Sequence, residues 1–270
     1  MPSAASTAVL SATAARLRAA GCVFAEDEAR LILRGAATEP ERDAMVARRA
    51  AGEPLEHVVG WAGFAGLRVA VGPGVFVPRR RTEFLARRTA ALAEAPAGAH
   101  PRVVVDLCCG SGAVGAAVAA AVPGIELHAA DVDPRAVGYA RRNLGAAGTA
   151  YTGDLFDALP AGLRGRVDVL VANVPYVPTG DVALLPAEAR DHEPRVSLDG
   201  GADGLDVLRR VAAGAPAWLA PGGSLLMETS DRQASYALAA LASTGLAART
   251  LTCEELDATI VIATLPPPAG

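Results

Sequence analysis

The chain has 270 residues, of which 51% are hydrophobic and 20% charged, and its formal net charge is -4. This length can hold one large domain, or one large and one small domain, and the composition excludes a disordered or collagen-like chain. The negative charge is not typical of a nucleic-acid-binding protein, although it leaves room for local basic patches.

The cysteines and the hydropathy narrow the class of protein further. None of the four cysteines forms a C-x-x-C pair or lies near a histidine at ligand spacing, so we expect no metal site and no disulfide framework. The N-terminus lacks a basic segment followed by an apolar run, and no uncharged apolar stretch reaches about 18 residues. These features predict a soluble, cytoplasmic protein without a membrane partner.

Residues 1–75 are predicted to form a small helical domain that ends in a β-hairpin. Apolar residues recur at helical spacing between residues 6 and 51, and Gly21 and Pro40 mark the breaks between short helices. Two alternating stretches joined by glycine, within residues 60–71, predict the hairpin.

Residues 76–270 are predicted to form an α/β domain with a seven-stranded, mostly parallel, Rossmann-like sheet. A composition shift at residues 95–98 marks the entry to this sheet, and apolar β-branched runs then alternate with helical patterns, which is typical of βαβ units. The expected strands are 103–107, 126–130, a weak one near residue 150, 167–172, 224–228, 247–251 and 260–263. The expected helices are 82–95, 113–121, 134–144, 205–213 and 232–243.

A buried strand, a glycine-rich turn and a helix follow one another between Val103 and Gly115. Backbone N–H groups and a helix N-terminus face a ligand in such a turn. About 19 residues after Gly112, a second strand ends in Asp131, where a carboxylate can bind both hydroxyls of a ribose. The turn lacks the first glycine of a dinucleotide fingerprint, and Asp106 would repel a diphosphate but suits a cationic amino-acid group. These details favour S-adenosylmethionine over NAD.

The strand 167–172 ends in a second motif, Asn173-Val174-Pro175-Tyr176. An asparagine carbonyl and a backbone carbonyl beside a proline can accept both hydrogens of an –NH2 group, while a tyrosine ring can stack on a flat π-system. The lone pair of such a nitrogen is delocalised, so positioning that favours pyramidalisation raises its reactivity. We therefore predict transfer to an amide or amino nitrogen, with Asn173, Pro175 and Tyr176 as the catalytic residues. The turn contains no acid or histidine, so we expect the proton to leave to solvent.

With these motifs the sequence resembles the PrmC/HemK family, the class I S-adenosylmethionine-dependent methyltransferases that modify the glutamine N5 of the GGQ motif in peptide-chain release factors. The resemblance covers nearly the whole chain. Its most specific elements are Glu53-Pro54-Leu55, Val77-Pro78-Arg79, Glu193-Pro194-Arg195 and the segment from Asp199 to Leu205.

The resemblance implies a role for each matching position. The cofactor site would consist of Asp106, Cys108, Gly110, Gly112, Asp131, Asp154, Leu155 and Asn173. Within it, Asp106, Gly110 and Gly112 would hold the methionine end, Asp131 the ribose, and Asp154 and Leu155 the adenine. The target amide would lie against Asn173, Pro175 and Tyr176, and the helical domain would dock a protein substrate.

The sequence departs from the family at several positions near these motifs. Cys108 stands where the family has a glycine, and Val174 replaces the first proline of the catalytic motif. Arg80 and Arg81 stand where the family has a proline or serine and an acid. These departures leave the identity of the protein substrate open, but not that of the cofactor.

Two other functions remain open from the sequence. The same catalytic motif could hold the amino group of an RNA or DNA base, although the net charge and the weakly basic first 75 residues argue against a nucleic-acid partner. The chain could also be an inactive protein that binds S-adenosylmethionine, with Cys108 and Val174 as marks of lost catalysis.

Overall fold

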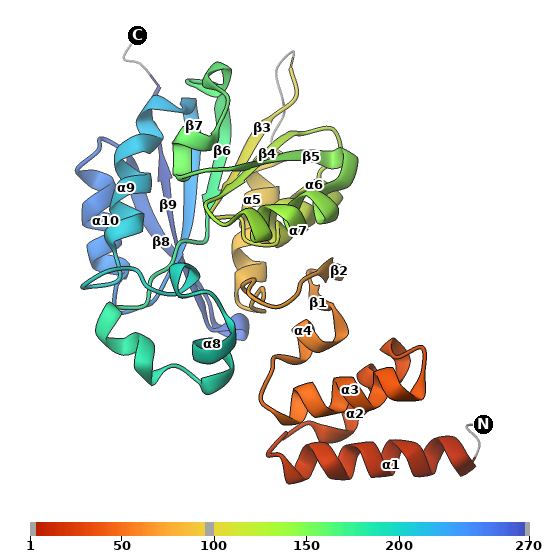
Figure 1. The fold of residues 1–270 in the computed structure, drawn as a ribbon. Coiled ribbons are helices and arrows are strands. Elements are labelled where there is room, and N and C mark those ends of the chain that lie inside the picture. Colours follow the sequence, from red (N-terminus) through yellow and green to blue (C-terminus); the bar gives the residue numbers. More distant parts are fainter. Residues whose placement is uncertain (1–3, 95–99, 268–270) are drawn as a thin grey trace.

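The computed structural model describes residues 4–94 and 100–267, and a seven-stranded sheet between two layers of helices forms its centre (Figure 1). The strand order is β5-β4-β3-β6-β7-β9-β8; β3 to β7 pair in parallel, and β9 pairs antiparallel with β7 and β8. This order confirms the predicted, mostly parallel sheet. The strands are β3 (Val103–Leu107), β4 (Glu126–Asp131), β5 (Gly148–Thr152), β6 (Val167–Ala172), β7 (Leu219–Thr229), β8 (Ala247–Cys253) and β9 (Ala258–Thr264).

Two hydrophobic cores cover the two faces of the sheet. Successive side chains of a strand point to opposite faces, so Val104 packs in one core and Val105 in the other. The first core lies under α5 (Thr82–Ala93), α6 (Ala113–Ala121) and α7 (Pro134–Leu144), and the second under α9 (Asp206–Gly214) and α10 (Ala234–Ala242). Burial on both faces explains the nearly continuous apolar runs of β3 and β6.

The N-terminal helices have a core of their own. Leu17, Ile32 and Val46 are fully buried among α1 (Ala4–Ala19), α2 (Ala25–Gly35), α3 (Glu39–Ala50) and α4 (Leu55–Val59). The predicted hairpin is present as β1 (Trp61–Phe64) and β2 (Leu67–Ala70), but its buried side chains share the first core of the sheet. The hairpin therefore packs on the larger unit. The predicted domain boundary between residues 75 and 76 stays a prediction.

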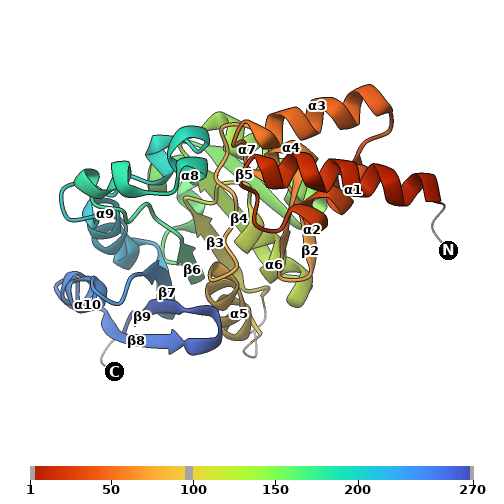
Figure 2. The same cartoon turned by 90° about the horizontal axis from the view of Figure 1, so that it is seen from below.

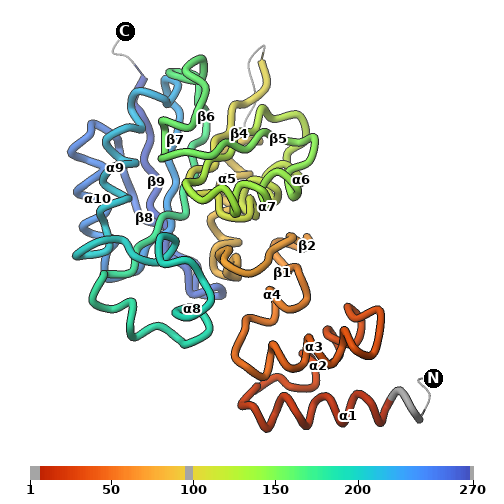
Figure 3. The backbone as a smooth tube through the Cα atoms, in the orientation of Figure 1, coloured from red at the N-terminus to blue at the C-terminus, as the bar shows by residue number. Residues whose placement is uncertain are grey.

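The strand order reverses between β3 and β6, so their carboxyl ends border a crevice of the kind that binds ligands in α/β proteins. The tube in Figure 3 shows the N-terminal helices and the loop with α8 (Ala187–His192) on this same side of the sheet. Seen from below in Figure 2, α8 and α3 lie toward the upper edge of the view, beside the central strands β3, β4 and β6. The helical unit and this loop thus flank the carboxyl edge.

One arginine joins these two flanking parts. In α3, Arg49 donates from Nε and Nη2 to both carboxylate oxygens of Glu28, at 2.6 and 3.0 Å. Its Nη1 donates to Oε1 of Glu188 in α8, at 2.8 Å, and to the backbone carbonyl of Glu53. The helical unit is therefore tied to the loop by a network of charge-assisted hydrogen bonds.

Most predicted elements are confirmed, several with the predicted bounds, including β3, β6, α6 and α7. The short helices α4 and α8 were missed because five or six residues do not show a helical period. β7 begins earlier than expected, at Leu219, because it continues through Pro221 and two glycines. The composition shift at residues 95–98 lies outside the described residues. Across the described ranges, no helix has the length and apolar character that a bilayer crossing requires.

Candidate active site

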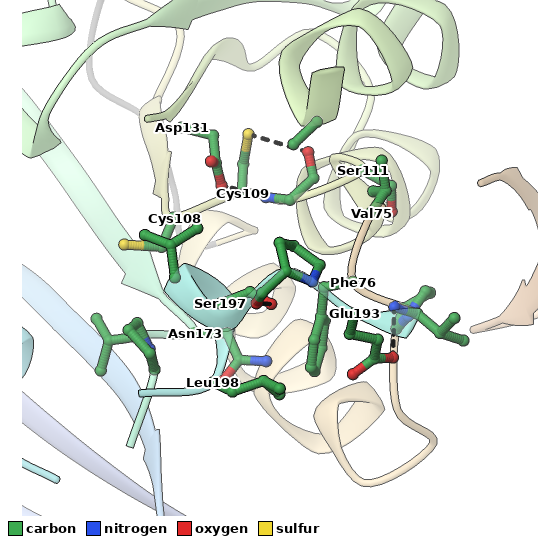
Figure 4. A pocket seen from close by; sticks show the side chains of 18 of the residues that line it. Val75, Phe76, Cys108, Cys109, Ser111, Asp131, Asn173, Glu193, Ser197 and Leu198 are labelled. Atoms are coloured by element: carbon green, nitrogen blue, oxygen red, sulfur yellow. Dashed lines mark hydrogen bonds between the residues drawn. The ribbon is translucent and has the colours of Figure 1, made fainter. Parts of the chain in front are cut away.

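A cavity of about 900 Å³ opens at the carboxyl edge of the sheet (Figure 4). Its walls come from the segment before α5, the turn after β3, the ends of β4, β5 and β6, and the loop that carries α8. Nearly all predicted site residues line it, namely Asp106, Cys108, Gly110, Asp131, Asp154, Leu155, Asn173, Pro175 and Tyr176. The structure thus brings together residues from four strand ends.

The carboxylate of Asp131 ties the end of β4 to the turn after β3. Its Oδ2 accepts a hydrogen bond from the Gly110 N–H at 2.9 Å, and its Oδ1 accepts one from the Asp133 N–H at 2.9 Å. Burial raises the pKa of Asp131, and these backbone hydrogen bonds oppose the rise. Each oxygen retains a second lone pair that can accept a hydrogen bond from a ligand hydroxyl.

Asp106 places a second carboxyl group in the cavity wall and is only 1% exposed. Its Oδ2 accepts a hydrogen bond from the Gly115 N–H in α6 at 2.9 Å. Burial raises the pKa of Asp106 from 3.8 to about 7, although this hydrogen bond lowers it. Within the described part of the chain it has no cationic partner, so an ammonium group of a ligand would offset the cost of its charge.

The two predicted glycines of the turn have different surroundings. Gly110 has a φ of +54° and lines the cavity, with open space where a Cβ would stand. Gly112 has a φ of +75° and does not line the cavity; a Cβ there would lie 3.0 Å from Cα of Ala140 in α7. Gly112 therefore allows close packing of two helices, whereas the backbone at Gly110 is open to a ligand.

Cys108 has a φ of +53°, in the left-handed region that favours glycine. A non-glycine residue pays about 1–2 kcal/mol for this conformation. We expect Cys108→Gly to raise the free energy of unfolding by about 0.5–1 kcal/mol, because the added flexibility of the unfolded chain cancels part of the gain. Urea denaturation measures the change.

Cys109→Gly is the matched control for this substitution. Cys109 is buried and is not among the residues with positive φ, so its replacement should destabilise the protein. Equal destabilisation by both substitutions would contradict a strained backbone at Cys108.

The two residues that the resemblance assigns to the adenine follow β5. Asp154 is half-exposed and pairs with Arg210 of α9 at 2.6 Å. Leu155 follows with a φ of +48°, and both residues line the cavity. The ion pair fixes the position of this turn against α9.

The predicted catalytic motif forms the other end of the cavity, where Figure 4 shows Asn173 between Leu198 and Ser197. Nδ2 of Asn173 donates to Oγ1 of Thr82, the first residue of α5, at 3.4 Å. Because the amide nitrogen is engaged there, the Asn173 carbonyl oxygen is left as an acceptor for a ligand. The backbone carbonyl of Tyr176 accepts from Nε2 of Gln233 at 2.9 Å, which anchors the far end of the turn.

The structure also brings Glu228 of β7 to this turn, a residue that the sequence analysis did not single out. The Tyr176 hydroxyl donates to Oε1 of Glu228 at 3.1 Å, and Glu228 is only 2% exposed. The motif itself contains no acid, as the sequence showed, but a carboxylate stands directly behind it. A glutamate at the end of a predicted apolar strand was the signal that could have identified it.

The three arginines before α5 separate into two kinds. Arg79 pairs with the buried carboxylate of Glu193 at 2.5 Å and lies over the Phe76 ring, so it fixes the loop after β6 to the cavity wall. Arg80 and Arg81 are exposed and line the mouth of the cavity. The basic run therefore supplies one cation that holds the loop and two that are exposed at the cavity.

Comparisons with known proteins find a methyltransferase domain in this chain. The model of the methyltransferase small domain family matches residues 67–187. A release factor glutamine methyltransferase from Geobacter sulfurreducens is 40% identical over 204 residues, which is 74% of this chain and 69% of that protein. One from Bifidobacterium longum is 35% identical over 275 residues, covering 90% of this chain and 93% of the relative. A methyltransferase structure from Pyrococcus furiosus superposes with a TM-score of 0.54 at 17% identity, over 83% of this chain and 98% of that one, and supports the fold.

Proposed function

Since the chain belongs to the family of release factor glutamine methyltransferases, we propose that it methylates the GGQ glutamine of a peptide-chain release factor. The methyl donor is S-adenosylmethionine. The observation that carries the proposal is the Asn173-Val174-Pro175-Tyr176 turn, which shares one cavity with the carboxylates of Asp106 and Asp131. In this proposal the enzyme acts in the cytoplasm, where its protein substrate takes part in translation.

The residues of the cavity fit this cofactor. The buried Asp106 suits the ammonium of the methionine end, and the free lone pairs of Asp131 suit two ribose hydroxyls. The open backbone at Gly110 lets the ligand approach closely. When bound, the cofactor supplies a methyl group on a positively charged sulfur, which a nitrogen lone pair attacks in line.

The protein contributes orientation at the accepting nitrogen. The Asn173 carbonyl oxygen and the backbone carbonyl of Val174, which precedes the proline, accept the two hydrogens of the glutamine amide. These bonds favour a pyramidal nitrogen whose lone pair points toward the methyl group, so they stabilise the transition state more than the planar ground state. The amide proton becomes acidic once the methyl group is attached and leaves to solvent.

Mass spectrometry of a release factor incubated with the enzyme and S-adenosylmethionine tests this function. We expect one added methyl group on the GGQ glutamine. The opposite outcome is an unmodified glutamine and, in a cell extract, a methyl label that ribonuclease removes. That outcome would make a nucleic-acid base the substrate instead.

The raised pKa of Asp106 predicts that cofactor binding depends on pH. Below about pH 7 the carboxyl of the free enzyme holds a proton, which must leave before it pairs with an ammonium group. We expect the dissociation constant of S-adenosylmethionine to fall by about tenfold per unit as pH rises from 5.5 toward 7, and then to level off. Calorimetry at several pH values measures it.

Asp106→Asn is the control for this dependence. Asparagine cannot ionise, so its dissociation constant should be higher and nearly flat over the same range. A wild-type affinity that weakens as pH rises through this range would contradict the assigned role.

We also propose that the helical unit within residues 1–75 docks the folded substrate, because Pro54 and Glu56 of this unit reach the rim of the cavity. Remote contacts then supply orientation that a short peptide lacks. We expect kcat/KM for a folded release factor to exceed that for a GGQ peptide by about tenfold or more. Equal kcat/KM values for the two substrates would contradict the docking role. The full chain is the right enzyme for this comparison, because the hairpin packs in the core of the sheet.

A further inference from the structure

A buried carboxylate stands beside the catalytic asparagine because of the register of the sheet. β6 and β7 pair Ala172 with Met227, so the next residues, Asn173 and Glu228, are neighbours at the carboxyl edge. Side chains alternate along each strand, and the residues two positions earlier, Val171 and Leu226, pack in the core under α5. Asn173 and Glu228 therefore point to the same face, toward the start of α5.

Polar and charged groups from two other segments surround Glu228. The Tyr176 hydroxyl donates to Oε1, while Oε2 is buried and accepts no hydrogen bond from the part of the chain that the structure describes. Burial raises the pKa of Glu228, whereas the hydroxyls of Thr82 and Tyr176 and the charges of Arg81 and Arg79 lower it. Thr82 begins α5, which packs against both β6 and β7, so its hydroxyl is the donor that the geometry offers to the unpaired Oε2.

Thr82 is also the partner of the catalytic amide. Its Oγ1 accepts from Nδ2 of Asn173 at 3.4 Å. A hydroxyl has one proton and an ionised carboxylate can only accept. When the Thr82 proton points to Glu228, the Thr82 oxygen can only accept from Asn173, and the Asn173 carbonyl oxygen must then face the cavity.

We propose that Glu228 is a positioning residue for methyl transfer, which sets the direction of the hydrogen bonds at Thr82 and Tyr176 and so aims the Asn173 carbonyl at the accepting nitrogen. The inference rests on the proposed function, and Glu228 itself touches neither substrate nor cofactor. If a hydrogen-bond donor replaces the Glu228 carboxylate, the Thr82 hydroxyl can donate to the Asn173 carbonyl instead. The Asn173 side-chain amide then turns and presents its two N–H groups to the amide nitrogen of the substrate. The facing N–H groups repel each other.

Two nearly isosteric substitutions test this chain of hydrogen bonds. Glu228→Gln replaces one acceptor oxygen with a donor, and Thr82→Val removes the hydroxyl while keeping the shape. We expect each to lower kcat on a folded release factor by about tenfold or more, with the dissociation constant of S-adenosylmethionine within about twofold of wild type. The double variant should be no slower than the slower single variant, because both break one network. Thr82→Ser keeps the hydroxyl and should restore most of kcat.

Other outcomes overturn the inference. A folded Glu228→Gln enzyme with wild-type kcat would do so, as would single effects that multiply in the double variant, since a residue that only stabilises the fold gives independent losses. If Glu228→Gln does not fold, a wild-type kcat in Thr82→Val overturns the inference by itself. A wild-type enzyme that leaves the release factor unmodified overturns the proposed function instead, and the same variants are then compared on the substrate that it labels in a cell extract.

Discussion

Asn173→Ala is expected to lower kcat by about 100- to 1,000-fold while the affinity for S-adenosylmethionine changes little. The substitution removes the carbonyl acceptor that orients the target amide, and one well-placed polar group in an active site is worth about this much. The Asn173 side chain hydrogen-bonds to Thr82 of α5, whereas the carboxylates that we assign to the cofactor stand at the ends of β3 and β4. Loss of activity should therefore appear in kcat rather than in cofactor binding.

Single-turnover kinetics and calorimetry on the same preparation separate these two quantities. A variant with normal turnover would contradict the amide clamp for any substrate. A variant that binds the cofactor tenfold more weakly would show instead that Asn173 belongs to the cofactor site, as the sequence analysis also expected.

Asp131→Ala is expected to raise the dissociation constant of S-adenosylmethionine by at least tenfold. In the proposed site the change removes charge-assisted hydrogen bonds to the ribose, each worth about 1.5–3 kcal/mol. It also releases the N–H groups of Gly110 and Asp133, so the turn after β3 loses its anchor to β4. Isothermal calorimetry measures the loss directly.

Asp133→Ala provides a matched control two residues away. The Asp133 side chain caps α7 by accepting from the Arg135 N–H, while its backbone N–H still serves Asp131 after the substitution. This variant should lose about 1 kcal/mol of stability and keep most of its cofactor affinity. Equal loss of affinity in both variants would mean that the ribose does not lie on Asp131.

The parts of the fold that local patterns encode could be predicted from the sequence. The turn after β3 and the start of α7 were located correctly, because glycine at residues 110 and 112 and proline at residue 134 mark the boundaries between apolar runs. The candidate site followed from the same glycine and proline boundaries, since ligand-binding residues of a parallel sheet stand at strand ends. Gly112 shows the limit of this reasoning, because its glycine serves helix packing against Ala140.

The features that the sequence did not reveal depend on which distant elements become neighbours. Glu228 reaches the turn after β6 because β7 lies between β6 and β9 in the sheet. Glu193 closes the cavity wall by pairing with Arg79, 114 residues earlier in the chain. Neither contact has a local period or spacing, so only the tertiary structure could identify them.

The network around Arg49 constrains how the chain can evolve. Arg49 uses a bidentate bond to Glu28 and two further hydrogen bonds from Nη1, one of them to Glu188, which is 139 residues away. Lysine cannot reproduce this planar set of donors, and loss of Arg49 leaves the little-exposed carboxylate of Glu28 without its cation. Substitutions of Glu28, Arg49 and Glu188 are therefore expected to be coupled in their effect on stability. We expect a helical unit taken from a relative to keep this tie to α8 when it brings an arginine at the position of Arg49.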